Sequence, residues 1–157
     1  RAQTGLALQK HLGYKGFTRT SQEELIKIIK EHKHRFHNNK AKYIIQARKF
    51  LDIKERVTNQ DRLQAREWLV LNIEGIGYKE ASHFLRNIGT KSLAILDRHI
   101  LNIMIEHKII KEKPKTLTKE KYKELEQKLI ILCKRLNFSQ AKLDLYLWYL
   151  KTNKVLK

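Results

Sequence analysis

The sequence predicts an all-α fold, a two-lobed helical bundle. Its 157 residues include one proline and six glycines, so few positions interrupt regular structure. Apolar residues recur every three or four positions rather than in alternation, which is the period of a helix and not of a strand. Hydrophobic residues make up 41% of the chain, which is enough to fill a core. We therefore expect a single folded domain over residues 1–157.

The N-terminal third is predicted to contain three helices. Residues 1–12 have helical character without a capping residue, so we expect the sequence to begin inside a helix, with further helix before it in the full protein. Ser21 and Glu24 form a capping box that begins the second helix. A third helix is expected from residue 38 into the region of Phe50. The apolar positions of the second and third helices are Leu25, Ile28, Ile29, Phe36, Ile44, Ala47 and Leu51.

Polar residues in front of apolar stripes predict where the later helices begin. These N-cap candidates are Thr58, Asp97, Thr118 and Ser139. Gly75 and Gly77 break the helical pattern, and a short helix is expected from Tyr78 to about Ile88, with Gly89 at its C′ position. A loop around Pro114 precedes the helix that Thr118 begins. The Thr118 helix carries Leu125, Leu129, Leu132 and Leu136, and the Ser139 helix carries Leu143, Tyr146, Leu147 and Leu150.

The charge of the chain narrows the class of partner. The 34 Lys+Arg residues against 16 Asp+Glu residues give a net charge of +18, which favours a polyanion and nucleic acid first. No run approaches the roughly 18 consecutive apolar residues of a membrane span. The single cysteine, Cys133, excludes an internal disulfide, a Cys-ligated zinc site and a four-Cys iron–sulfur cluster. We expect an intracellular monomer with no cofactor and no membrane partner.

Three histidines lie close together at His32, His34 and His37. Their spacing does not match a common zinc site and no cysteine joins them, so we expect a solvated basic face and no metal. Cys133 lies on an apolar stripe and is expected in the core.

The segment from Asn72 to Leu85 carries the informative motif. An apolar helix, Gly75-Ile-Gly77 and a second helix form the pattern of a helix-hairpin-helix over about residues 62–88. Both glycines are expected in backbone angles closed to other residues, and they let the backbone approach a phosphate. The unpaired amides at the start of the second helix, with its dipole, form an anion site. Gly75, Gly77 and Tyr78 are therefore candidate DNA-backbone contacts, although an ordinary helix–helix turn would share the Gly-x-Gly.

Lys79 and Asp97 extend this pattern. Lys79 lies in the first turn after the hairpin, and Asp97 follows 18 residues later. A ten-residue helix is about 15 Å long. The eight residues that follow it stretch to roughly 26 Å. The chain therefore has the length to return Asp97 beside Lys79. Taken alone, Lys79 would be a phosphate-binding surface lysine.

These residues resemble the helix-hairpin-helix DNA glycosylases. Gly75-Ile-Gly-Tyr-Lys79 followed by Ile95-Leu-Asp97-Arg-His-Ile is similar to their signature. The archaeal type of 8-oxoguanine DNA glycosylase/AP lyase is similar in addition at residues 143–157 and 35–44. The family's iron–sulfur members differ, because this chain has one cysteine. The resemblance implies a double-stranded DNA partner containing oxidised guanine.

The resemblance implies the chemistry of two residues. Lys79 would attack C1′ as a neutral amine, form a Schiff base with the opened sugar and cut the strand by β-elimination. Asp97 would stabilise the oxocarbenium-like transition state of base loss. The alternatives are a glycosylase of the same superfamily for another damaged base, and a non-catalytic DNA-binding module. A binding module needs neither residue at a set spacing.

The resemblance also implies a pocket for the extruded base, formed by helices over about residues 118–157. Phe36 and Trp148 would be stacking walls, although helical periodicity alone favours the core for both. Lys157 would contact the base, and a frayed basic tail is its alternative. Asp144 would accept a hydrogen bond from a base N–H or lie on a solvated helix face. Candidate phosphate contacts are Lys40, Lys42 and His99, with Lys10, Lys15, Arg19 and Arg86 as further cations.

Overall fold

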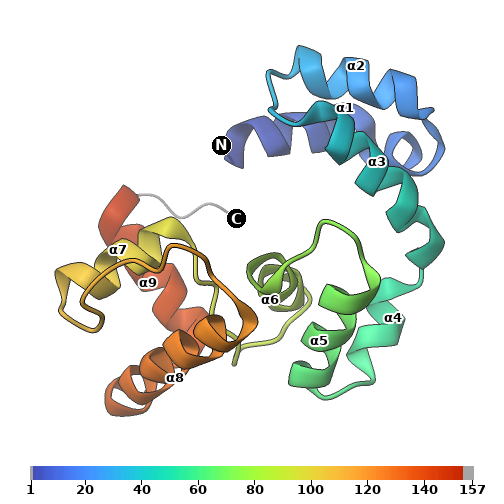
Figure 1. Cartoon of the computed structure of the whole chain (residues 1–157). Coiled ribbons are helices and arrows are strands. Elements are labelled where there is room, and N and C mark those ends of the chain that lie inside the picture. The colour runs from blue at the N-terminus through green and yellow to red at the C-terminus, as the bar shows by residue number, and fades with distance from the viewer. Residues whose placement is uncertain (1, 154–157) are drawn as a thin grey trace. The chain divides into compact units, whose positions relative to one another are not determined.

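The computed structural model describes residues 2–153, and every regular element in that range is a helix (Figure 1). This confirms the predicted all-α class. The helices are α1 (Ala2–Arg19), α2 (Gln22–Glu31), α3 (His37–Ala47), the 3₁₀ turn η1 (Arg48–Phe50), α4 (Ile53–Thr58), α5 (Arg62–Asn72), α6 (Tyr78–Asn87), α7 (Arg98–Glu106), α8 (Lys119–Leu136) and α9 (Gln140–Thr152). The chain divides into two compact units. Unit 1 contains the residues up to Arg56 together with Leu71–Gly75, and unit 2 contains Val57–Val70 and the residues from Ile76 onward.

Unit 1 is built on α1, α2 and α3, and α2 packs against α3. Its core contains Leu8, Leu12, Leu25, Ile29 and Ala41. Ser21 begins α2 as predicted, because its side chain accepts a hydrogen bond from the amide of Glu24 at 3.2 Å. Arg48 donates to the carbonyls of Phe17 at 2.8 Å and Thr20 at 2.6 Å. The end of α1 is thereby held against the turn that follows α3.

Two apolar residues predicted to face the core of unit 1 are exposed. Phe36 does not continue α2, because α2 ends at Glu31 and the chain turns through left-handed residues at Lys33 and Phe36. Its ring is 69% exposed at the start of α3. Leu51 is 62% exposed, because α3 ends at Ala47 and η1 changes the helical register that would have turned Leu51 inward.

The region around Thr58 also differs from the prediction. Thr58 is the last residue of α4, a short helix that the sequence pattern did not predict. Helix α5 is capped instead by Asp61, whose side chain accepts hydrogen bonds from the amides of Leu63 at 2.8 Å and Gln64 at 3.4 Å. An aspartate caps a helix at least as well as a threonine, and Asp61 lies at the position where the turn after α4 ends.

Unit 2 has its core between α7, α8, α9 and the segment that enters α7. Its buried residues are Ala94, Leu96, Ile100, Leu101, Met104, Tyr122, Leu125, Leu129, Cys133 and Leu143. Cys133 is in the core as predicted, and burial raises the pKa of its thiol. Leu136, which the stripe would place with them, is exposed at the end of α8.

The predicted ends of the helices in unit 2 are confirmed. The side chains of Asp97, Thr118 and Ser139 each accept a hydrogen bond from a first-turn amide of the helix that follows. Gly89 follows α6 with a φ of 113°, and the amide of Thr90 donates to the carbonyl of Leu85 at 2.9 Å. A left-handed glycine after the C-cap is the expected way to end such a helix.

Candidate active site

The hairpin between α5 and α6 uses its two glycines differently. Gly75 has a φ of 86°, and a Cβ built on it would lie 2.4 Å from Cδ2 of Tyr43. Gly77 has φ −95° and ψ −176°, which is extended backbone open to any residue. The expectation that both glycines need special angles is therefore right for Gly75 and wrong for Gly77. A Cβ at Gly77 would lie 3.2 Å from Oε2 of Glu80, so the missing side chain leaves room for that carboxylate.

The amides that open α6 are engaged by a side chain of the same helix. Glu80 lies at the third position of α6, and its carboxylate accepts hydrogen bonds from the backbone of Gly77 and of Glu80 itself. Burial opposes the ionised form, but the Lys79 ammonium and these amides hold the pKa of the Glu80 carboxyl below its ordinary value. The predicted phosphate site thus already receives an anion, as in a capping box.

Lys79 and Asp97 each stand at the first turn of a helix in unit 2. The Lys79 ammonium forms an ion pair with Glu80 at 2.8 Å, and its side chain is 43% exposed. Asp97 accepts the amides of His99 at 2.8 Å and Ile100 at 2.9 Å, both through Oδ1. The cap orients this carboxylate at the start of α7.

His83 lies within electrostatic reach of both residues. Burial, Arg86 and Lys79 lower the pKa of its imidazole, while Glu80 and Asp97 raise it, and the net effect is a lowered value. His83 follows Lys79 by one helical turn, so the two side chains share one face of α6. The structure therefore brings the lysine and the aspartate to one charged cluster on unit 2.

Arg86 and Asp144 complete this cluster. Nη1 of Arg86 forms an ion pair with Asp144, and Nη2 lies 3.0 Å from Nε2 of His83. Arg86, a candidate phosphate contact, is thus bound to a carboxylate of its own chain. Burial raises the pKa of Asp144 to about 6; Arg86 opposes the shift and the nearby Asp97 charge adds to it. Asp144 is no solvated surface residue.

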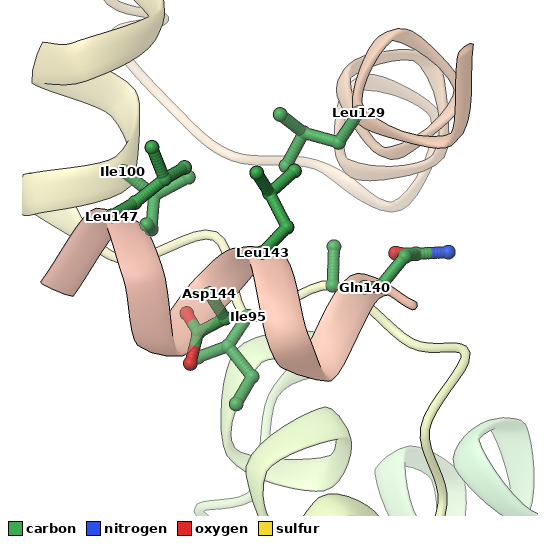
Figure 2. A pocket seen from close by; sticks show the side chains of 8 residues that line it. Ile95, Ile100, Leu129, Gln140, Leu143, Asp144 and Leu147 are labelled. Carbon is green, nitrogen blue, oxygen red and sulfur yellow. The ribbon is translucent and has the colours of Figure 1, made fainter. Parts of the chain in front are cut away.

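A small cavity lies beside Asp144, with a volume of about 10 Å³. Figure 2 shows Leu143 and Leu147 pointing from α9 toward Leu129 and Ile100, with the Asp144 carboxylate beside Ile95. Ala94 and Gln140 complete the lining. In this state the cavity has room for about one water molecule and none for a purine.

The predicted base-recognition residues are placed as follows. Trp148 on α9 is half-buried, and its ring meets His99 edge to face with centroids 5.2 Å apart. This contact joins α9 to the first turn of α7, where Asp97 lies. Phe36 belongs to unit 1, with the guanidinium of Arg35 at 5.8 Å from its ring centre. Lys157 lies outside the described residues.

The predicted DNA-backbone lysines both have partners in unit 1. Lys40 donates to the carbonyl of Arg35 at 2.9 Å and contacts His34, and burial with the Arg35 charge lowers its pKa. Lys42 forms an exposed ion pair with Glu74 at 2.9 Å, directly before Gly75. Such an exposed pair contributes little to stability.

Tyr78 has its side chain occupied. Its hydroxyl donates to Glu67 at 2.5 Å, and the same carboxylate is paired with Lys119 and Lys123. Burial favours the protonated carboxyl, but the bonds from Lys119, Lys123 and Tyr78 outweigh it, and the pKa of Glu67 falls to about 2. Of Tyr78, the backbone amide is the group that suits a phosphate contact.

Sequence reasoning missed several members of this site. Glu80 and His83 were detectable, since Gly77-x-x-Glu80 is a capping-box spacing and His83 falls on the face of Lys79. Glu126 and Arg66, a buried ion pair of unit 2, carried no local signal because 60 residues separate them.

Residues 2–153 contain no group of three or more His, Cys, Asp or Glu side chains arranged to hold a metal ion. His32 instead bonds the carbonyl of Ile28 at 2.9 Å and packs against His11. Across the same residues, none of the helices combines the length and apolar character needed to cross a membrane.

Known proteins resemble this chain over nearly its full length. A family model described as 8-oxoguanine DNA glycosylase matches residues 1–138. The 8-oxoguanine DNA glycosylase/AP lyase of Methanocaldococcus jannaschii is 48% identical over 157 residues, covering 99% of this chain and 75% of that protein. The protein of the same name from Korarchaeum cryptofilum is 44% identical, with 99% and 75% covered.

Solved structures show the same similarity. The crystal structure of the M. jannaschii 8-oxoguanine glycosylase/lyase in complex with 15mer DNA containing 8-oxoguanine superposes with a TM-score of 0.95 at 47% identity, covering 100% of this chain and 76% of that one. The 8-oxoguanine DNA glycosylase of Thermotoga maritima superposes with a TM-score of 0.94 at 43% identity, covering 100% and 75%.

Proposed function

Since this chain belongs to the 8-oxoguanine DNA glycosylase family, we propose that it removes 8-oxoguanine from duplex DNA and then cuts the strand at the abasic site. The family model matches most of the chain, and relatives at 44–48% identity bear the name 8-oxoguanine DNA glycosylase/AP lyase. The observation that carries the assignment of residues is the charged cluster of unit 2, where Lys79 and Asp97 both act on His83.

DNA binding begins at the hairpin. The backbone amides of Gly77 and Tyr78 and the positive end of α6 receive a phosphate, and Glu80 moves aside to release them. Lys40, Lys42 and His99 supply further phosphate contacts. Because these contacts go to the backbone, they hold the strand without reading its sequence.

The chemistry follows from the two helix starts. Both capping bonds of Asp97 use Oδ1, which leaves Oδ2 to stabilise the positive charge that develops as the bond between C1′ and the base breaks. The Lys79 amine, once it has given up its proton, attacks C1′ and forms the Schiff base. Loss of a C2′ proton then expels the 3′ phosphate, and water releases the enzyme.

Recognition of the base is assigned to the C-terminal helix and its surroundings. Trp148 stacks on the extruded purine, and Asp144 accepts a hydrogen bond from a base N–H. Phe36 and Lys157 are further candidates for contacts to the base. The raised pKa of Asp144, about 6, makes this hydrogen bond sensitive to pH near neutrality. The cavity beside Asp144 must widen to admit a purine.

Borohydride trapping tests the proposal. Incubation with a duplex that holds one 8-oxoguanine, followed by borohydride, is expected to yield a covalent protein–DNA adduct. Lys79→Gln abolishes the adduct, whereas Lys121→Gln keeps it. Lys121 is a matched control, since it is 41% exposed and forms a comparable ion pair with Glu124 at 2.7 Å. Absence of an adduct with the unaltered chain, or full trapping by Lys79→Gln, would refute the lysine assignment.

The same proposal covers the oligomeric state, the partner and the cellular location of the chain. It acts as a monomer on double-stranded DNA within the cell. Light scattering of the purified chain, with and without a damaged duplex, measures how many protein chains bind each duplex. A stable protein dimer in the complex would contradict the monomer.

A further inference from the structure

A hydrogen-bonded network of unit 2 is buried directly behind Asp97. Tyr122, on α8, donates its hydroxyl to the carbonyl of Ala94 at 2.7 Å and accepts the amide of Leu96 at 3.3 Å. The side chain is 1% exposed, and burial raises its pKa to about 12, so the hydroxyl remains a donor at neutral pH. The Tyr122 hydroxyl thus bonds to residues 94 and 96 of the segment that leads to Asp97.

Glu126 holds the same segment from one helical turn further along α8. Its Oε1 accepts the amide of Ala94 at 2.9 Å. Both of its oxygens also accept from Arg66 of α5, at 2.7 and 2.8 Å. Glu126 and Arg66 are buried, and the guanidinium lies 5.5 Å from the Tyr122 ring centre. Removing one partner of a buried pair leaves an uncompensated charge in the core, so the two side chains stay together in the folded chain.

The network reaches the proposed catalytic carboxylate through three residues of backbone. Ala94 and Leu96 are pinned by Tyr122 and Glu126, and the amide of Asp97 donates to the carbonyl of Ile95 at 3.0 Å. Asp97 then begins α7 with its own side chain as the cap. Directed hydrogen bonds in a buried site rigidify the backbone groups that they join.

We propose that Tyr122 and Glu126 are positioning residues that act through Asp97: they set the backbone of residues 94–96 and so the place of the carboxylate at the reacting sugar. This rests on the proposed function. Neither side chain touches DNA, because both are enclosed by α5, α8 and the segment they hold. A shift of about 1 Å in a reacting group lowers a rate by about a hundredfold.

Tyr122→Phe is the sharpest test, since it keeps the ring and removes the hydroxyl alone. We expect single-turnover excision of 8-oxoguanine to fall by about ten- to a hundredfold. Nicking of a preformed abasic site should stay within about threefold, because that substrate has no glycosidic bond for Asp97 to help break. Duplex affinity should not change. Tyr14→Phe, at a position of α1 that is 75% exposed, is the matched control and keeps all three values.

A second variant and a double variant separate positioning from general damage to the fold. Glu126→Gln should give the same pattern as Tyr122→Phe, with Glu124→Gln as its exposed control on α8. In an Asp97→Asn background, Tyr122→Phe should lower excision no further, because a residue that acts through Asp97 has nothing left to position.

Three results would overturn the inference. They are unchanged excision by Tyr122→Phe, an equal loss of excision and abasic-site nicking, and a further loss of full size in the Asp97→Asn background. A wild-type chain that fails to excise 8-oxoguanine overturns the proposed function itself, and the wild-type reaction distinguishes that failure from the others.

Discussion

Replacing Gly75 by alanine should destabilise the hairpin by a calculable amount. Gly75 has a φ of 86°, where an L side chain is strained by about 1–2 kcal/mol. The new Cβ would also lie 2.4, 2.7 and 2.8 Å from Cδ2, Cε2 and Cγ of Tyr43. These are ring atoms on α3 that move only with the whole side chain. Overpacking of this kind costs about 1–3 kcal/mol, so the total is about 2–5 kcal/mol.

Thermal unfolding followed by circular dichroism measures this loss. For a chain of this size each 1 kcal/mol moves Tm by about 2–4 °C, so Gly75→Ala should lower Tm by about 4–20 °C. Gly5→Ala is the control, because its Cβ meets nothing within 4 Å and it lies inside α1. Alanine is the better helix former there, so its Tm should stay equal or rise.

A double-mutant cycle with Tyr43→Ala separates the backbone strain at residue 75 from the overpacking against the Tyr43 ring. Without the ring, Gly75→Ala should keep only the strain of its φ, about 1–2 kcal/mol. A Tm for Gly75→Ala within about 1 °C of the unaltered chain would refute the reasoning, since even the strain alone exceeds that shift. An equal loss with and without the ring would remove the Tyr43 contact from the account.

Three further outcomes follow from the cluster on unit 2. Asp97→Asn should keep the cap of α7 and duplex binding while excision falls by about a hundred- to a thousandfold; gel assays of excision at undiminished rate would contradict it. Glu80→Gln should tighten binding of undamaged duplex by about two- to fivefold, measured by fluorescence anisotropy, because the competing charge leaves the hairpin amides; weaker binding would exclude this competition. Asp144 has a folded pKa of about 6 against an ordinary 3.8, so its contribution to stability is complete below pH 3.8 and is lost as the pH rises through 6. The Tm of the unaltered chain should therefore fall more steeply between pH 4 and pH 7 than that of Asp144→Asn, and parallel curves would contradict the raised pKa.

Much of the fold was predictable because its signals are local. Asp97, Thr118 and Ser139 cap amides within three residues of themselves, so a short stretch of sequence determines each helix start. Gly89 ends α6 for the same kind of reason. The hairpin with Lys79 and Asp97 was likewise readable as a motif of spacing and residue type.

The errors arose where a local pattern competed with chain geometry. Thr58 satisfied the rule for a helix cap, but the chain still had to complete α4 before Asp61 could begin α5. Phe36 continued an apolar stripe that ends where α2 ends, five residues earlier. A periodic pattern does not mark the turn at which its helix stops.

The sequence by itself determined most of the helices, the hairpin and the pair of residues to which we assign the chemistry. Only the tertiary structure decided what surrounds them. Arg86 meets Asp144 across 58 residues and Arg66 meets Glu126 across 60, and no spacing rule connects positions so far apart. A helix cap joins residues that are close in sequence, so the sequence alone predicts it. The bonds that Tyr122 and Glu126 make to residues 94–96 join distant positions, so they exist only after the chain has folded.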